Sequence, residues 1–136
     1  MQIGNKIIIT KTPLRISFVG GGTDIPSFYE NNMYGSVISS TIDKYLYVIV
    51  KKQNKLFDEK YRLNYSITEQ VKNIKKIKNP IIKACIQYLK INEPLFIGTI
   101  SDIPASSGMG SSSTFCVGLL KALYELKNIK KDKKMI

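Results

Sequence analysis

The first half of the chain alternates apolar and polar residues in short runs rich in β-branched side chains, a pattern that predicts β-strands. Within the first run, Pro13 is expected to interrupt the strand, and the glycines at residues 20–22 end it. A proline at the start of residues 26–31 predicts a short helix. The predicted strands cover residues 6–12, 14–19, 35–40, 41–52, 61–66 and 94–101.

A longer hydrophobic period in the second half predicts helices. Across residues 68–78, apolar residues recur at every third position and lysines fill the other face, which predicts an amphipathic helix. The Asn-Pro pair at residues 79–80 ends that helix and begins another. Residues 111–127 carry the strongest helical pattern of the chain. The expected buried face of this last helix consists of Val117, Leu120, Leu123 and Tyr124.

Strands followed by helices, and then a strand that leads into a helix, predict an α+β fold in which helices cover one face of a sheet. The length of 136 residues corresponds to one domain. The lysine-rich residues 130–136 predict either the first turn of a further helix or a frayed basic C-terminus.

Composition excludes several classes of protein. No apolar run approaches the ~20 residues that cross a bilayer, and the first residues lack a signal-peptide pattern, so we expect a cytoplasmic protein with no membrane partner. The absence of histidine removes His-dependent nucleophiles, bases and metal sites. Cys85 and Cys116 form no Cys-x-x-Cys pair and are expected to be reduced, buried thiols.

The net charge of +11 comes almost entirely from lysine, because Arg15 and Arg62 are the only arginines. Arginine is the residue most used to recognise guanine edges and to bind phosphates through bidentate hydrogen bonds. Nucleic-acid binding is therefore disfavoured. A basic surface of this kind still attracts phosphorylated small molecules.

The segment at residues 104–113, Pro-Ala-Ser-Ser-Gly-Met-Gly-Ser-Ser-Ser, lies between a predicted strand and the strongest helix. Helix N-termini bind anions through their free amides, and Gly108 and Gly110 let the backbone approach a phosphate closely. No lysine follows as in a P-loop, and the third glycine of a dinucleotide-binding fingerprint is missing. The alternative interpretation is an ordinary serine N-cap after a glycine turn.

This segment resembles the second motif of the GHMP kinases, P-x-x-x-G-L-G-S-S, with Met109 in the place of leucine. The resemblance implies a loop around the phosphates of ATP, with Ser112 as a ligand of Mg²⁺. The implied nucleotide-binding residues are Pro104, Ser107, Gly108, Met109, Gly110, Ser111, Ser112 and Ser113.

Residues 13–24 resemble the first motif of the same family, which reads R-V-N-L-I-G-E-H-T-D in galactokinases. Arg15 falls on its arginine and Thr23-Asp24 on its Thr-Asp, whereas Gly21-Gly22 replaces Glu-His. The resemblance implies that Arg15 supports catalysis near the transferred phosphate. The implied sugar-binding residues are Gly21, Gly22, Thr23, Asp24 and Asp43. Ordinary alternatives are a surface ion pair for Arg15, an Asx turn at Asp24 and a pair of Asp43 with Lys44.

Further short matches, at residues 20–24, 41–45, 65–69 and 102–105, resemble the D-glycero-D-manno-heptose 7-phosphate kinases. They imply ATP-dependent phosphorylation of the anomeric hydroxyl of a heptose 7-phosphate. The resemblance covers nearly all of the chain and implies the N-terminal GHMP kinase domain, which is similar to the second domain of ribosomal protein S5.

Members of the family add a second α+β domain that carries the catalytic aspartate. We therefore expect residues 1–136 to be a truncated N-terminal part that lacks this domain and is inactive alone. Apolar surface exposed by the truncation is expected to favour a homodimer. Three alternatives stay open: a fucose-type kinase of the same family, a non-catalytic module that binds a sugar or nucleotide, and a basic nucleic-acid-binding module.

Overall fold

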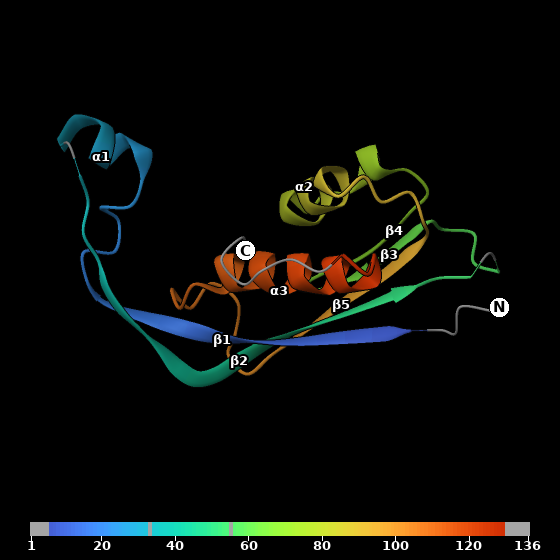
Figure 1. The fold of residues 1–136 in the computed structure, drawn as a ribbon, viewed down its shortest axis with the longest axis horizontal. Coiled ribbons are helices and arrows are strands. Elements are labelled where there is room, and N and C mark those ends of the chain that lie inside the picture. The colour runs from blue at the N-terminus through green and yellow to red at the C-terminus, as the bar shows by residue number, and fades with distance from the viewer. Residues whose placement is uncertain (1–5, 33, 55, 130–136) are drawn as a thin grey trace.

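In the computed structural model, which describes residues 6–32, 34–54 and 56–129, the strands form one mixed sheet in the order β1-β2-β5-β3-β4. The elements are β1 Ile7–Val19, α1 Pro26–Asn32, β2 Ile38–Lys52, β3 Tyr61–Asn64, β4 Thr68–Val71, the 3-10 turn η1 Ile74–Lys76, α2 Pro80–Tyr88, β5 Leu95–Ser101 and α3 Ser111–Leu126. Only the β3–β5 pair is parallel. Helices α2 and α3 lie on one side of the sheet (Figure 1), which confirms the α+β prediction.

The core lies between α3 and the inner face of the sheet, where every second strand residue is buried. Gly118 permits the close approach: a β-carbon there would come within 2.9 Å of Thr12 Oγ1. The Thr10 hydroxyl donates to the Gly118 carbonyl at 2.9 Å. Fully buried side chains of this core include Leu14, Val48, Val50, Leu63, Ile82, Ile86, Leu95, Ile97, Leu119 and Leu123.

The predicted break at Pro13 is wrong, because β1 runs through it. Pro13 pairs with Tyr45, and Arg15 then pairs with Thr41, so three residues of β2 stand opposite Leu14. A proline is tolerated here because β1 is the edge strand of the sheet. The two strands predicted over 35–52 are likewise one strand, β2. The three residues opposite Leu14 form an irregular stretch inside it.

The helix predicted over residues 68–78 is also wrong. Its first part is strand β4, which pairs with β3, and its second part is the 3-10 turn η1. The side chain of Asn73 caps that turn by accepting a hydrogen bond from the amide of Lys75 at 2.9 Å. A repeat of three apolar positions fits the end of a strand followed by a three-residue turn as well as it fits an α-helix.

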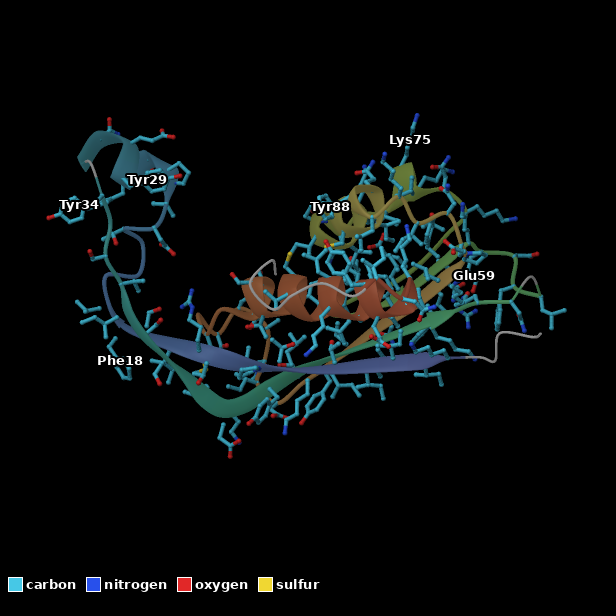
Figure 2. All side chains as sticks on the ribbon, in the orientation of Figure 1. Phe18, Tyr29, Tyr34, Glu59, Lys75 and Tyr88 are labelled. Atoms are coloured by element: carbon cyan, nitrogen blue, oxygen red, sulfur yellow. The ribbon has the colours of Figure 1, made fainter. Side chains whose placement is uncertain are left out.

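Residues 16–32 and 34–40, beginning and ending in the paired tips of β1 and β2, form an arm that projects from the rest of the sheet and carries α1, the predicted short helix (Figure 1). Two glycines hold the arm together: a β-carbon on Gly20 would lie 1.9 Å from Ser36 O, and one on Gly35 equally close to Thr23 O. The Thr23 hydroxyl is within hydrogen-bond distance of the Gly20 and Ser36 carbonyls, at 2.8 and 2.9 Å. Figure 2 shows Phe18, Tyr29 and Tyr34 on this arm, away from the core.

Cys85 on α2 and Cys116 on α3 are both free, as expected, although only Cys85 is fully buried. Burial first, and then the hydrogen-bonded neighbour Cys116, raises the pKa of the Cys85 thiol to about 12. In the described part of the chain, no helix combines the length and the apolar character needed to cross a membrane. The helix turn considered for residues 130–136 lies outside the described residues.

Candidate functional site

The loop between β5 and α3 is fixed at its start by Asp102. The backbone amide of Asp102 donates to the Tyr45 carbonyl at 3.0 Å, and its carboxylate accepts from the Tyr45 amide at 2.8 Å. Beyond this anchor, Ser106, Gly108 and Gly110 all have left-handed backbone angles, with φ of 65°, 74° and 74°. Turns of this kind direct successive N–H groups into one concave, anion-attracting surface.

Helix α3 begins directly after this loop with its first amides free. Its N-cap is Gly110, which makes no side-chain cap, so the serine N-cap interpretation is wrong. The first helical bond runs from the Thr114 amide to the Gly110 carbonyl at 3.0 Å. Among the described residues, the amides of 111–113 have no protein acceptor, and Ser112 and Ser113 are exposed. This helix end therefore offers donors and a positive dipole to an anion.

Arg15 brings the first motif to the second. Its amide donates to the Met109 carbonyl at 3.2 Å, and its side chain packs on Gly110, where a β-carbon would come within 3.1 Å of Arg15 Cγ and Nε. The guanidinium donates to Ser17 Oγ at 2.7 Å. No carboxylate of the described residues pairs with it. The surface ion pair is thus not what the structure contains, and the Arg15 charge lies beside the open end of α3.

A cavity of about 230 Å³ lies beside the same loop. Its walls come from the loop, the first turns of α2 and α3, the inner side of β2 and β5, and the turn after β3. The lining residues are Leu46, Tyr65, Ser66, Asn79, Ile81, Thr99, Ser101, Ala105, Ser106, Ser111, Ser112 and Phe115. The cavity has one apolar side and several polar groups, which is typical of a small-molecule site.

The cavity wall that contains Tyr65 and Asn79 is fixed in place by a buried carboxylate, that of Glu69. It accepts hydrogen bonds from the Tyr65 hydroxyl, from the Lys78 amide at 2.8 Å and from the Asn79 amide at 3.3 Å. Burial opposes ionisation of Glu69, but these donors outweigh it and lower the pKa of the carboxyl. Burial first, and then the bond to Glu69, raises the pKa of Tyr65 to about 12.

The sugar-binding candidates lie elsewhere. Gly21, Gly22, Thr23 and Asp24 are on the arm, and none of them lines the cavity. The Asp24 carboxylate accepts from the Gly22 amide at 3.1 Å. This donor lies two residues before Asp24, whereas in an Asx turn it lies two residues after the aspartate. Asp43 is exposed in the irregular stretch of β2.

Of the predicted nucleotide-binding residues, Ser111 and Ser112 reach the cavity. The others, including Pro104 and Ser107, form the loop and helix end beside it. Sequence reasoning assigned no functional role to Glu69, Tyr65, Asn79 or Asp102, although Tyr65, Glu69 and Asp102 lie in the short heptose-kinase matches. No sequence pattern marks Glu69, because its strand Thr68–Val71 is mostly polar and its partners are two backbone amides and a hydroxyl.

Within the described residues, no group of three or more acidic or cysteine side chains gathers to hold a metal ion. The exposed hydroxyl of Ser112 is the oxygen donor that stands next to the free amides of α3. Mg²⁺ is often held mainly by substrate phosphates with few protein ligands. A single hydroxyl at this position fits a metal of that kind.

Comparison with known proteins gives a consistent result. The family described as "GHMP kinases N terminal domain" matches residues 56–136. The chain is 34% identical to a D-glycero-alpha-D-manno-heptose 7-phosphate kinase of Campylobacter jejuni, over 91% of this chain and 39% of that protein. It is 30% identical to a galactokinase of Pyrococcus furiosus, over 92% of this chain and 35% of that protein.

Among solved structures, the fold is similar to a D-glycero-D-manno-heptose 1-phosphate kinase from Bacteriodes thetaiotaomicron. The TM-score is 0.71 with 25% sequence identity, over 90% of this chain and 42% of the other. The chain thus spans less than half the length of each of these relatives.

Proposed function

The chain belongs to the GHMP kinase family, and from that membership we propose that it supplies the ATP-binding part of a kinase that phosphorylates the anomeric hydroxyl of D-glycero-D-manno-heptose 7-phosphate. The observation that carries the proposal is the contact of Arg15 with Gly110 at the uncapped end of α3. Residues about ninety positions apart in sequence there build one cationic, amide-rich site.

The phosphates of ATP are assigned to the loop and the first turn of α3. The free amides of residues 111–113 and the left-handed glycines on either side of Met109 offer donors without side chains in the way. Arg15 adds a full positive charge that no carboxylate of the described residues neutralises. Phosphoryl transfer depends mostly on positioning and on stabilising the charge of the transferred group, and these groups do both.

The nucleoside is assigned to the cavity beside the loop. Its volume of about 230 Å³ suits a base rather than a whole nucleotide, and Ser111 and Ser112 connect it to the phosphate site. The apolar wall formed by Leu46, Ile81 and Phe115 can contact a flat ring.

The acceptor sugar is assigned to the side of the loop on which Arg15 and the arm lie. Gly21, Gly22, Thr23, Asp24 and Asp43 are its proposed contacts, as the family resemblance implies. In the reaction, the sugar hydroxyl oxygen bonds to the γ-phosphorus, the bond from that phosphorus to the ADP oxygen breaks, and the hydroxyl proton passes to the aspartate that the family resemblance implies in the second domain. Arg15 would hold the γ-phosphoryl group in line for that attack.

Mg²⁺ would be held by Ser112 together with the phosphates. When bound, the ion neutralises part of the negative charge that repels an incoming hydroxyl. The Ser112 hydroxyl is exposed and free to turn toward such an ion.

The test is an assay of the full-length protein with ATP, Mg²⁺ and three acceptors: D-glycero-D-manno-heptose 7-phosphate, L-fucose and D-galactose. Phosphorus NMR of the product identifies the phosphorylated carbon. We expect turnover on the heptose 7-phosphate at its anomeric position, and a loss of about a hundredfold or more in the Arg15→Ala variant.

A matched control is Lys11→Ala, which removes a cation from the same strand. Lys11 lies over the ring of Tyr45, 3.8 Å from its centroid, and is exposed. Preferred turnover of L-fucose would replace the substrate assignment with a fucose-type kinase. Binding of ATP and sugar without turnover would replace it with a non-catalytic binding module.

A further inference from the structure

The cavity beside the loop has polar walls of two kinds. One wall, at Ser111 and Ser112, is continuous with the proposed phosphate site. The opposite wall contains Tyr65 and Asn79. Both are tied to the buried carboxylate of Glu69, Tyr65 through its hydroxyl and Asn79 through its backbone amide.

We propose that Glu69 is a positioning residue for this cavity: by fixing Tyr65 and Asn79, its carboxylate determines how tightly the base of a nucleotide is held, but not how tightly its phosphates are held. The inference rests on the proposed function, since it takes the cavity as the site of the base. Glu69 itself is only 6% exposed and is not among the lining residues.

The first step in the argument is that Glu69 joins two elements that form the wall. It lies on β4, and it accepts from the backbone amides of Lys78 and Asn79 immediately before α2. The third donor, Tyr65, belongs to the turn between β3 and β4. One carboxylate therefore sets the distance between that turn and the first residues of α2.

The second step concerns the direction of the hydrogen bonds. An ionised carboxylate only accepts, so the Tyr65 hydroxyl proton must point at Glu69. The Asn79 side-chain oxygen accepts from the Ile82 amide at 3.1 Å, which turns its NH₂ group the other way. The Asn79 side chain lies near the Tyr65 hydroxyl and acts to lower its pKa, against the larger effects of burial and Glu69.

The Tyr65 oxygen is left with acceptor capacity only. A wall with a fixed acceptor suits a ligand that presents a donor, such as the exocyclic amino group of a base. Rigid polar groups also lose less freedom when a ligand binds than mobile ones do.

The third step is that the effect is confined to one wall. None of the hydrogen bonds made by Glu69 in the described structure reaches residues 102–113, which carry the proposed phosphate site. Tyr65 and the Asn79 amide donate to one oxygen of Glu69, and the Lys78 amide donates to the other. Gln has the shape of Glu but replaces one oxygen by NH₂, so in Glu69→Gln either Tyr65 and the Asn79 amide or the Lys78 amide face a donor. The wall then has to rearrange while the loop and α3 keep their contacts.

The experiment is isothermal titration of the full-length protein, with Mg²⁺ present, against two ligands: ATP and inorganic tripolyphosphate, which has the phosphates without the base. We expect Glu69→Gln to weaken ATP by about tenfold, the loss of one good hydrogen bond, and to leave tripolyphosphate within about twofold. Tyr65→Phe should do the same, and the double variant should lose little more than either single one.

Two control variants match the substitutions. Glu93→Gln changes a partly exposed glutamate that pairs with Lys52, and Tyr88→Phe changes a tyrosine of α2 that is 66% exposed (Figure 2). Both should bind the two ligands as the unaltered protein does. If Glu69→Gln does not fold, as a melting curve will show, Tyr65→Phe carries the test, because it keeps the carboxylate.

Equal weakening of ATP and tripolyphosphate would assign Glu69 a general structural role and overturn the inference, as would no change for either ligand. Both of those results leave the proposed function standing. If the unaltered protein binds tripolyphosphate as well as ATP, the cavity does not hold the base, and the inference fails together with that part of the proposed function. If it binds neither ligand, both proposals are wrong as a whole.

Discussion

The side chain of Arg15 lies against the backbone of Gly110, so a residue of the edge strand β1 touches the N-cap residue of α3. The contact requires glycine twice over. Gly110 has a φ of 74°, and an added β-carbon would come within 3.1 Å of two side-chain atoms of Arg15. The loop glycine thus serves the backbone turn and the placement of the arginine at the same time.

Gly110→Ala and Gly108→Ala separate these two roles. Both residues have a φ of 74°, but the space around Gly108 is open. We expect each variant to lose about 1–2 kcal/mol of unfolding free energy from the left-handed backbone. Only Gly110→Ala should also lose ATP affinity through displacement of Arg15. In an Arg15→Ala background that additional loss of ATP affinity should vanish. Titration of ATP against Gly110→Ala and Gly108→Ala, each with and without Arg15→Ala, measures it, and a loss that persisted without Arg15 would contradict the prediction.

Ser112→Ala tests the assignment of the Mg²⁺ ligand. Because Gly110 is the N-cap and Ser112 is exposed, the variant should change the unfolding free energy by less than about 0.5 kcal/mol. Turnover at limiting Mg²⁺ should fall, and excess Mg²⁺ should restore part of it. Ser113→Ala, one position along the same exposed turn, is the matched control. Unchanged Mg²⁺ dependence in Ser112→Ala would remove this residue from the metal site.

The free energy of unfolding should depend on pH through Glu69 at acid pH and through its partner Tyr65 at alkaline pH. Folding lowers the pKa of Glu69 from its ordinary 4.5, so its contribution to stability is present above that pH and is lost as the pH falls through the lower, folded value. Glu93 adds to the same acid limb, because a hydrogen bond from its own amide, and then its pairing with Lys52, lowers its pKa despite burial. Glu69→Gln should therefore flatten the acid limb without abolishing it, as urea unfolding across the pH range will measure.

Tyr65 acts in the opposite direction. Folding raises its pKa from 10.0 to about 12, so its contribution is complete below pH 10.0 and is lost as the pH rises toward about 12. Tyr65→Phe should remove that alkaline loss. A variant that lost stability at high pH as steeply as the unaltered protein would show that the phenol does not titrate in this way.

Gly118→Ala should destabilise the core. The added β-carbon would meet Thr12 Oγ1 at 2.9 Å and Val48 Cγ2 at 3.1 Å, and overpacking of this kind costs about 1–3 kcal/mol. Val117→Ala, next along α3 but 40% exposed, should change stability by less than about 0.5 kcal/mol. Chemical denaturation of the two variants provides the comparison, and equal values would mean that the helix moves away from the sheet at no cost.

Much of the fold could be predicted from periodicity. The helix at residues 111–126 and the strands at 7–19, 38–52 and 95–101 are where alternation or helical spacing put them, to within a few residues. The prediction of which residues form the buried face of α3 was only partly correct. Leu123 and Tyr124 are buried, but Val117 is not, and the contact with the sheet is made by Gly118, whose lack of a side chain hides it from any hydrophobic pattern.

The candidate site also contains some residues that the sequence could predict and others that it could not. The loop and Arg15 could be found because local sequence specifies a glycine turn before a helix and an arginine in a recognisable motif. The Glu69 network could not, because its partners are backbone amides and a hydroxyl that no side-chain pattern announces. The helix predicted over 68–78 also hid it, since a helix would not have placed Glu69 on the inner face of a sheet.

The position of β5 between β2 and β3 has a consequence for synthesis of the protein on the ribosome. The β1–β2 and β3–β4 hairpins emerge first, yet they do not pair with each other within the sheet. They can join only after Ser101, the last residue of β5, has left the exit tunnel. Until then the nascent chain carries open strand edges, which invite aggregation or chaperone binding. Since β5 leads directly into the glycine-rich loop, the step that closes the sheet also places the loop that we propose binds the phosphates of ATP.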